Sequence, residues 1–156
     1  MSLNWTLPES WQKITAVDAH TCGEPLRIFT DGIPDLPGDT ILAKRRYAQE
    51  QLDWLRTATM WEPRGHADMY GCILTEPVTL DGDLGVLFLH NAGFSTMCGH
   101  GIIGLTKVVL DTGMLDKPVD APVLRIDTPA GRVTATGQRM NGRIKSISFH
   151  NVPSFV

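Results

Sequence analysis

The sequence has few cysteines, no strong charge of either sign and no long apolar run. Its 3 Cys are an odd number without a CxxC spacing, which argues against a disulfide scaffold and a structural zinc site. The 14 Lys and Arg against 17 Asp and Glu give a net charge of -3, so no basic surface for nucleic acid is expected. Apolar runs such as 84–89 are far shorter than the roughly 20 residues that cross a bilayer, and the N-terminus lacks the pattern of a signal peptide. We therefore expect a soluble, cytoplasmic protein that binds neither nucleic acid nor membrane.

The chain is long enough, and apolar enough, to form one domain with its own core. It has 156 residues, of which 42% are hydrophobic. We expect residues 1–12 to be a lead-in segment and residues 13–156 to form the folded unit. Residues 152–156 are apolar and no polar tail follows them, which suggests that the chain is part of a longer protein.

The first half of the chain predicts strands around one helix. Alternating residues predict strands at 14–19 and 26–29, joined by a turn at 21–25. A loop rich in Gly, Pro and Asp follows at 31–38, after which Asp39 or Thr40 can cap a helix that runs to about Thr57. The apolar runs 69–74 and 84–89 then predict neighbouring strands, and their near-continuous apolarity suggests that both faces are covered.

The second half of the chain predicts a buried helix followed by three strands. After a loop at Gly93, residues 101–110 have helical length and are hydrophobic nearly all round, so we expect a helix whose sides cannot face water, ending near Gly113. Strands are predicted at 123–126, 132–136 and 143–149, the last two joined across Asn141 and Gly142. The predicted fold class is α+β, with about seven strands.

Residues 91–101 contain the most informative group of candidate functional residues. Cys98 lies at or just before the predicted helix start, where free backbone N–H groups favour an anion and should stabilise its thiolate. The amides of Gly99, His100 and Gly101 could hold a carboxylate, and glycines on both sides of His100 would let a ligand approach. A thiol base beside a carboxylate site is what removal of the α-proton of an amino acid requires. The alternative is a packed cysteine followed by a tight turn.

Two further clusters carry polar side chains. Residues 61–71 combine charged groups, His66 and aromatic residues, which is typical either of a loop that lines a site or of a solvated loop pinned by Glu62–Arg64 or Arg64–Asp68 contacts. Residues 18–25 hold carboxylates and a His in a turn, but no third ligand has metal-binding spacing, so no metal is expected. Cys72 lies in an apolar strand and is expected to belong to the core, and Cys22 is expected to be a bystander.

Three segments together resemble the proline racemase family, which also contains 4-hydroxyproline epimerases and trans-3-hydroxy-L-proline dehydratases. They are His20–Pro25, Glu62–His66 with Asp68–Gly71 after it, and Met97–His100. The resemblance implies a cofactor-independent enzyme in which Cys98 exchanges the α-proton of a proline-type amino acid. It also implies substrate-binding roles for Gly99, His100, Gly101, Tyr70 and His66.

The same resemblance implies the architecture. The chain would be one half of a diaminopimelate-epimerase-like two-lobed fold, in which a mixed, mostly antiparallel sheet wraps around a buried central helix. Residues 13–156 would form the N-terminal lobe with the first catalytic cysteine. The C-terminal lobe, which would be its partner across the site, is missing from the chain, and with it the residue that separates racemases and epimerases from dehydratases. Cys22 departs from the family pattern, because it stands where the motif has a glycine.

The remaining sequence favours dehydration of trans-3-hydroxy-L-proline to a cyclic imine, a hydro-lyase reaction. His90-Asn91, Phe94-Ser95-Thr96 and Trp61 resemble the dehydratase branch more than the other branches. Proline racemase or 4-hydroxyproline epimerase activity stays as an alternative, and so does a non-catalytic domain that binds carboxylated ligands. This piece alone is expected to be inactive, and the quaternary state stays open, with a homodimer as one option.

Overall fold

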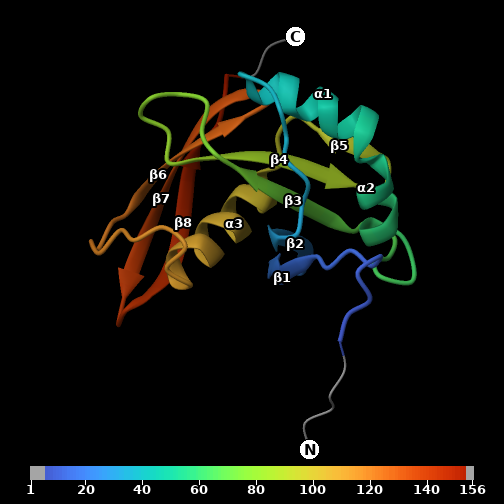
Figure 1. Cartoon of the computed structure of the whole chain (residues 1–156). Coiled ribbons are helices and arrows are strands. Elements are labelled where there is room, and N and C mark those ends of the chain that lie inside the picture. Colours follow the sequence, from blue (N-terminus) through green and yellow to red (C-terminus); the bar gives the residue numbers. More distant parts are fainter. Residues whose placement is uncertain (1–5, 154–156) are drawn as a thin grey trace, which may run out of the picture.

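The computed structural model describes residues 6–153 (Figure 1). Residues 1–5 of the expected lead-in segment and residues 154–156 of the apolar end lie outside the described residues. Within residues 6–153, no helix has the length and apolarity needed to cross a membrane.

Eight strands and three helices make up the described chain. In order they are β1 (Thr15–Thr21), β2 (Glu24–Asp31), α1 (Ile41–Gln51), α2 (Asp53–Met60), β3 (Tyr70–Thr75), β4 (Leu84–His90), β5 (Gly93–Ser95), α3 (Gly99–Asp111), β6 (Val123–Thr128), β7 (Gly131–Met140) and β8 (Arg143–His150).

The strands form one mixed sheet that curves around α3. The order is β1-β2-β3-β4-β6-β7-β8, and β5 pairs with β4 outside this path. The pairs β2–β3 and β4–β6 are parallel and the others are antiparallel. Helix α3 contacts strands from both ends of the sheet, namely β1 and β2 on one side and β7 and β8 on the other (Figure 1). The predicted α+β fold, a mostly antiparallel sheet around a central helix, is therefore confirmed.

Both faces of the central strands are covered, as the apolar runs suggested. In β4, Val86 and Phe88 pack with α3, whereas Leu87 and Leu89 pack with α1 and α2 on the opposite face. All four side chains have no exposed surface. Alternate residues of a strand point to opposite faces, so a strand covered on both sides needs apolar residues at every position. This is why the run 84–89 has no polar alternation.

The predicted helix from residue 40 is wrong in length and continuity. Thr40 does cap it, because its hydroxyl accepts a hydrogen bond from the Ala43 amide at 3.1 Å. Leu52, however, leaves the helical region at φ -122 and ψ 19, and a second helix then continues to Met60. The buried Leu52 side chain takes part in the core at this break, so packing outweighs the unbroken helical pattern.

Two hairpin turns use residues with left-handed backbone. Cys22 and Gly23, at φ 51 and 101, join β1 to β2, and Asn141 and Gly142, at φ 53 and 78, join β7 to β8. Both predicted hairpins are confirmed, and the first turn is tighter than the expected 21–25. The left-handed conformation at Cys22 gives a physical reason for a glycine at this place in the family motif.

Helix α3 begins after Cys98 and ends before Gly113, which has φ 73. Its inward side is buried along Ile102, Leu105 and Val109. The expectation that no side faces water is wrong, because Lys107 is exposed and Ile103 and Val108 are only half-buried.

Candidate active site

Cys98 is the N-cap residue of α3, in extended conformation at φ -147 and ψ 111. Its Sγ accepts a hydrogen bond from the Gly101 amide at 3.3 Å, and its carbonyl accepts from the Ile102 amide at 2.9 Å. The sulfur therefore takes the place that a Ser or Asp oxygen usually occupies at a helix start. This local geometry directs the thiol toward the first turn of the helix.

The glycines around His100 have different reasons for being there. A Cβ at Gly101 would lie 2.6 Å from Phe88 Cε1 and 3.0 Å from Cys98 Sγ, so packing against the core excludes any side chain. A Cβ at Gly99 would meet nothing closer than Phe149 Cζ at 3.4 Å. The expectation that both glycines open the backbone to a ligand is wrong at Gly101, whose amide is also already engaged by the sulfur.

The His100 imidazole lies against the thiol. Its Nδ1 is 3.4 Å from Cys98 Sγ, and its Nε2 is 3.3 Å from the Pro25 carbonyl oxygen. The sulfur also lies 3.7 Å from Nε2, so it faces the imidazole ring between its two nitrogens. A carbonyl can only accept, so the proton of the neutral ring belongs on Nε2, and Nδ1 is the nearer and unprotonated nitrogen. Thr21 Oγ1 donates to the His100 carbonyl at 2.9 Å and ties this first turn to the end of β1.

Tyr70 completes the group around Cys98 from β3. Its ring stacks on His90 at a centroid distance of 5.1 Å and meets His100 edge-on at 5.0 Å. Its hydroxyl donates to Ser95 Oγ at 3.0 Å. Sheet register produces this arrangement, because Tyr70 pairs with His90 across β3 and β4, and β5 pairs on the other side of β4.

The electrostatics of the site set burial of the Cys98 thiol against the donors around it. Burial raises the pKa of the Cys98 thiol, and the opposing effects of the Gly101 amide, the nearby Tyr70 side chain and the His100 amide offset this only in part. The amides at the helix start do lower the pKa of the thiol, as predicted, but desolvation outweighs them, so the net direction is upward. Burial also raises the pKa of Tyr70. Burial, with a smaller contribution from Arg56, lowers the pKa of His90.

No site role was assigned from the sequence to several residues of this group. Ser95 belongs to β5, a strand of three residues that is too short to show a pattern and was predicted as loop. Arg45 from α1 donates to the Phe94 carbonyl, at 3.1 Å from Nε, and holds β5 in place. The buried Arg56 donates to the carbonyls of His90 and Asn91 at the β4–β5 turn. Arginines that bond to distant carbonyls leave no local signal in a sequence.

The loop around His66 lines a cavity of its own. His66 lines a cavity of about 500 Å³ together with Trp61, Glu62, Ala67, Asp68, Asn91 and Ala92. Asn91 Nδ2 donates to the carbonyls of Met60 and His66, at 2.8 and 2.9 Å, and fixes the loop to the β4–β5 turn. Within residues 6–153, no hydrogen bond or ring contact joins His66 to Cys98. No Glu62–Arg64 or Arg64–Asp68 ion pair forms in that part of the chain either, so the proposed pinning contacts are wrong.

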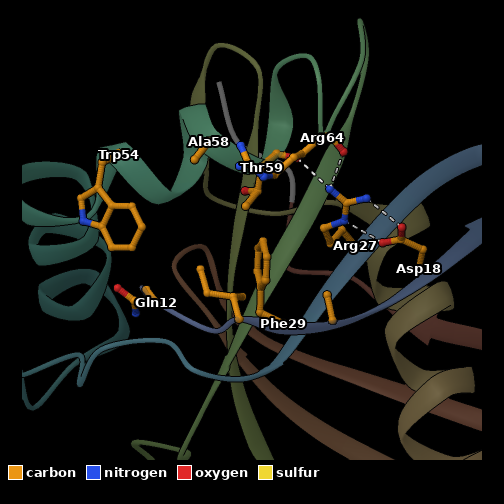
Figure 2. A pocket seen from close by; sticks show the side chains of 10 residues that line it. Gln12, Asp18, Arg27, Phe29, Trp54, Ala58, Thr59 and Arg64 are labelled. Carbon is orange, nitrogen blue, oxygen red and sulfur yellow. Dashed lines mark hydrogen bonds and ion pairs between the residues drawn. The ribbon is translucent and has the colours of Figure 1, made fainter. Parts of the chain in front are cut away.

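One of the two carboxylates of the 18–25 cluster, Asp18, has a structural partner. Asp18 accepts two hydrogen bonds from Arg27, both at 2.8 Å, and Arg27 also donates to the carbonyls of Thr59 and Arg64 (Figure 2). These groups line a cavity of about 650 Å³ with Trp54 and Phe29, and Phe29 packs with the core on the α1 and α2 face of the sheet. This cavity is therefore distinct from the Cys98 group, which lies on the α3 face. Residues 6–153 contain no group of three His, Cys, Asp or Glu side chains arranged to hold a metal ion.

The chain is similar in sequence and in fold to known proteins. Residues 16–156 match the family model described as proline racemase. The chain is 52% identical over 142 residues to a trans-3-hydroxy-L-proline dehydratase of Bacillus thuringiensis subsp. konkukian, which covers 91% of the chain and 42% of that relative. It is 45% identical to a 3-hydroxyproline 2-epimerase of Burkholderia multivorans, over 93% of the chain and 43% of that relative.

Among solved structures, a hydroxyproline epimerase from Agrobacterium vitis with bound trans-4-hydroxy-L-proline superposes with a TM-score of 0.83. It is 25% identical, and the match covers 91% of the chain and 42% of that structure. The chain thus spans less than half the length of the relatives that it matches, and its fold is that of half of their two-lobed structure.

Proposed function

The chain belongs to the proline racemase family, and on that basis we propose that the protein containing it dehydrates trans-3-hydroxy-L-proline by cysteine-mediated removal of the α-proton. The observation that carries this proposal is the Cys98 thiol at the start of α3, with the Nδ1 atom of His100 3.4 Å from its sulfur. The similarity to a trans-3-hydroxy-L-proline dehydratase over 91% of the chain supports the choice of substrate.

In the proposed mechanism, Cys98 acts as the base in its thiolate form. The Nδ1 atom of His100 accepts the thiol proton, and the thiolate then takes the α-proton of the substrate. Because burial raises the pKa of Cys98, a thiolate that forms in this dry site is a stronger base than an exposed one. The substrate then loses its 3-hydroxyl as water with help from an acid, and the resulting enamine tautomerises to the cyclic imine.

The substrate carboxylate needs fixed donors, because removal of the α-proton adds negative charge beside it. We assign this role to the amides of Gly99 and His100 at the start of α3, since the first N–H groups of a helix have no carbonyl acceptor within it. Such donors contribute roughly 2.7–4 kcal/mol each in dry sites that stabilise an oxyanion. Gly101 acts differently, by donating to the sulfur itself. Tyr70 would cover the substrate ring, and His66 would contribute from the neighbouring loop.

We propose that residues 13–156 are the N-terminal lobe and that a second lobe completes the site across a cleft. That lobe supplies the acid for the leaving hydroxyl, so the piece alone is inactive. The proposal places the enzyme in the cytoplasm, uses no cofactor and allows a homodimer.

An epimerase is the second candidate, and the similarity to a 3-hydroxyproline 2-epimerase favours it. The two reactions share the first proton abstraction at Cys98 and differ in the later steps. An epimerase returns a proton to the opposite face of the same carbon, whereas a dehydratase expels the 3-hydroxyl.

The full-length protein incubated with trans-3-hydroxy-L-proline in D₂O tests the proposal. Loss of one water with formation of the imine supports the dehydratase. Inversion with deuterium at the α-carbon and an intact hydroxyl would establish the epimerase instead. L-proline and the 4-hydroxyproline isomers, run in parallel, separate the other family activities.

The variant Cys98→Ser tests whether the thiol of Cys98 is the base. Cys22→Ser, at an exposed cysteine, is its matched control. We expect near-total loss of turnover in Cys98→Ser and unchanged turnover in Cys22→Ser. A non-catalytic domain that binds carboxylated ligands predicts instead that no substrate is turned over, and that Cys98→Ser still binds proline-type carboxylates.

A further inference from the structure

We propose that the Tyr70 hydroxyl, held in place by Ser95, is a hydrogen-bond donor that stabilises the Cys98 thiolate. The inference deepens the proposed function and rests on it, because it takes Cys98 as the base. It assigns a positioning role to Ser95, which the sequence marked only through the resemblance of residues 94–96 to the dehydratase branch.

The geometry brings Tyr70 and Cys98 together through three strands. Tyr70 reaches across its register partner His90, on which it stacks, to donate to Ser95 Oγ at 3.0 Å on β5. Cys98 follows Ser95 by three residues, so the residue that accepts from Tyr70 and the N-cap of α3 belong to one short segment. The Tyr70 ring also meets His100 edge-on at 5.0 Å, and His100 contacts the sulfur.

Two hydroxyl groups in series can respond to the charge of the sulfur. With a neutral thiol, Tyr70 donates to Ser95. When His100 takes the thiol proton, the Tyr70 O–H can turn to the negative sulfur, and the Ser95 hydroxyl can then donate to the tyrosine oxygen. Hydrogen bonds to a charged acceptor are roughly twice as strong as neutral ones, so this rearrangement favours the thiolate.

The need for such a donor follows from the surroundings of the thiol. Burial raises the pKa of Cys98, and the nearby Glu24 carboxylate acts in the same direction. The other titratable groups that face the thiol are His100 on α3 and Tyr70 and Cys72 on β3. Of these, Tyr70 and His100 can stabilise a negative sulfur, whereas Cys72 is fully buried and its pKa is raised further.

The test measures the pH dependence of alkylation of Cys98 by iodoacetamide in the full-length protein, followed by peptide mass spectrometry. The variants are Tyr70→Phe, Ser95→Ala, Ser95→Thr and the double variant Tyr70→Phe with Ser95→Ala. Tyr47→Phe and Ser148→Ala, both outside this group, are matched controls. Tyr70→Phe keeps the ring and its stacking on His90, so the variant isolates the hydroxyl.

We expect Tyr70→Phe to move the alkylation midpoint up by about one pH unit, which makes reaction at pH 7 about 10-fold slower. Ser95→Ala should slow the reaction about 3-fold and Ser95→Thr should restore it, because threonine keeps the hydroxyl. The double variant should match Tyr70→Phe alone, since Ser95 acts through Tyr70.

A Tyr70→Phe profile that superimposes on that of the parent would overturn the inference. So would an effect of Ser95→Ala that is as large in the Tyr70→Phe background as in the parent. The readout does not depend on turnover, which separates this inference from the proposed function. A shifted midpoint in a protein without dehydratase activity supports the hydrogen bond, and full activity with superimposed profiles rejects it.

Discussion

The carbonyl oxygen of Pro25 lies 3.3 Å from Nε2 of His100 and thereby orients the imidazole that contacts Cys98. Pro25 follows the tight turn between β1 and β2, and His100 belongs to the first turn of α3. The hairpin turn thus sets the tautomer of a residue that is 75 positions away in the sequence. Because the Nε2 proton is engaged by the carbonyl, Nδ1 is the nitrogen that can receive the thiol proton.

His100→Gln should remove this proton acceptor while it keeps a polar side chain of similar size. We expect kcat/KM of the full-length enzyme for trans-3-hydroxy-L-proline to fall by about 10²–10⁴-fold, which is typical for the loss of a general base. His150→Gln, at an exposed position on β8, is the control and should be unchanged. Activity of His100→Gln within a factor of about two of the parent would contradict the assignment.

Gly101→Ala should destabilise the fold even though alanine is the better helix former. Its Cβ would lie 2.6 Å from Phe88, which is fully buried and cannot move aside. We expect the free energy of unfolding to fall by about 1–3 kcal/mol, the usual cost of overpacking a core. Gly99→Ala, two residues earlier, adds a Cβ at ordinary contact distance and should leave stability unchanged. Denaturant unfolding of both variants checks the contrast, and equal stabilities would refute the packing explanation.

The sequence sufficed to place elements that are defined by local pattern. The Asn141-Gly142 turn, the Thr40 cap and the doubly covered strand β4 all follow from residues close together in the chain. The Cys98 position at a helix start was predictable for the same reason. The resemblance to a family added the proposed substrate class, which local pattern does not contain.

The features that the sequence could not predict depend on tertiary contacts. The three-residue strand β5 exists because β4 and Arg45 bind its backbone. The break at Leu52 follows from burial of one side chain in the core. Whether the pKa of Cys98 rises or falls depends on the balance between burial of the thiol and the hydrogen-bond donors around it. Only the folded structure determines both.

The Asp18–Arg27 pair should make stability depend on pH in the acid range. The two hydrogen bonds from Arg27 lower the pKa of Asp18, so the folded state keeps the carboxylate charged at a pH where the unfolded chain, with a pKa of about 3.9, is protonated. The contribution is complete above that value and is lost as the pH falls through the folded pKa.

Asp18→Asn should therefore cost about 0.5–1 kcal/mol at pH 7, because the Asp18 side chain is largely exposed, and nothing at about pH 2. Chemical unfolding of parent and variant at both pH values measures this. Asp31→Asn, at the end of β2, is a control whose side chain forms no ion pair among residues 6–153. A cost for Asp18→Asn that persists at pH 2 would show that the pair acts through packing and not through charge.

Arg56→Met tests whether one buried cation supports the Tyr70 side of the site. Arg56 donates to Asp53 and to the carbonyls of His90 and Asn91, and its side chain is buried between α2 and the β4–β5 turn. Methionine preserves much of the packing but removes the guanidinium donor from the His90 carbonyl and from Asp53, whereas the Asn91 carbonyl keeps the Trp61 Nε1 donor at 2.9 Å. We therefore expect a loss of about 1–3 kcal/mol in unfolding free energy. Arg46→Met, at an exposed position of α1, should change stability by no more than about 0.5 kcal/mol.

The same Arg56→Met variant should also affect the thiol, because His90 is the stacking partner of Tyr70. If Arg56 holds the turn that places both His90 and β5, alkylation of Cys98 at pH 7 should slow in Arg56→Met but not in Arg46→Met. A variant that loses stability yet keeps the parent's alkylation profile would show that the turn and the Tyr70–Ser95 hydrogen bond are independent. If both the unfolding free energy and the alkylation rate fall, Arg56 fixes the position of the stacked Tyr70–His90 pair and, through that pair, the environment of the Cys98 thiol.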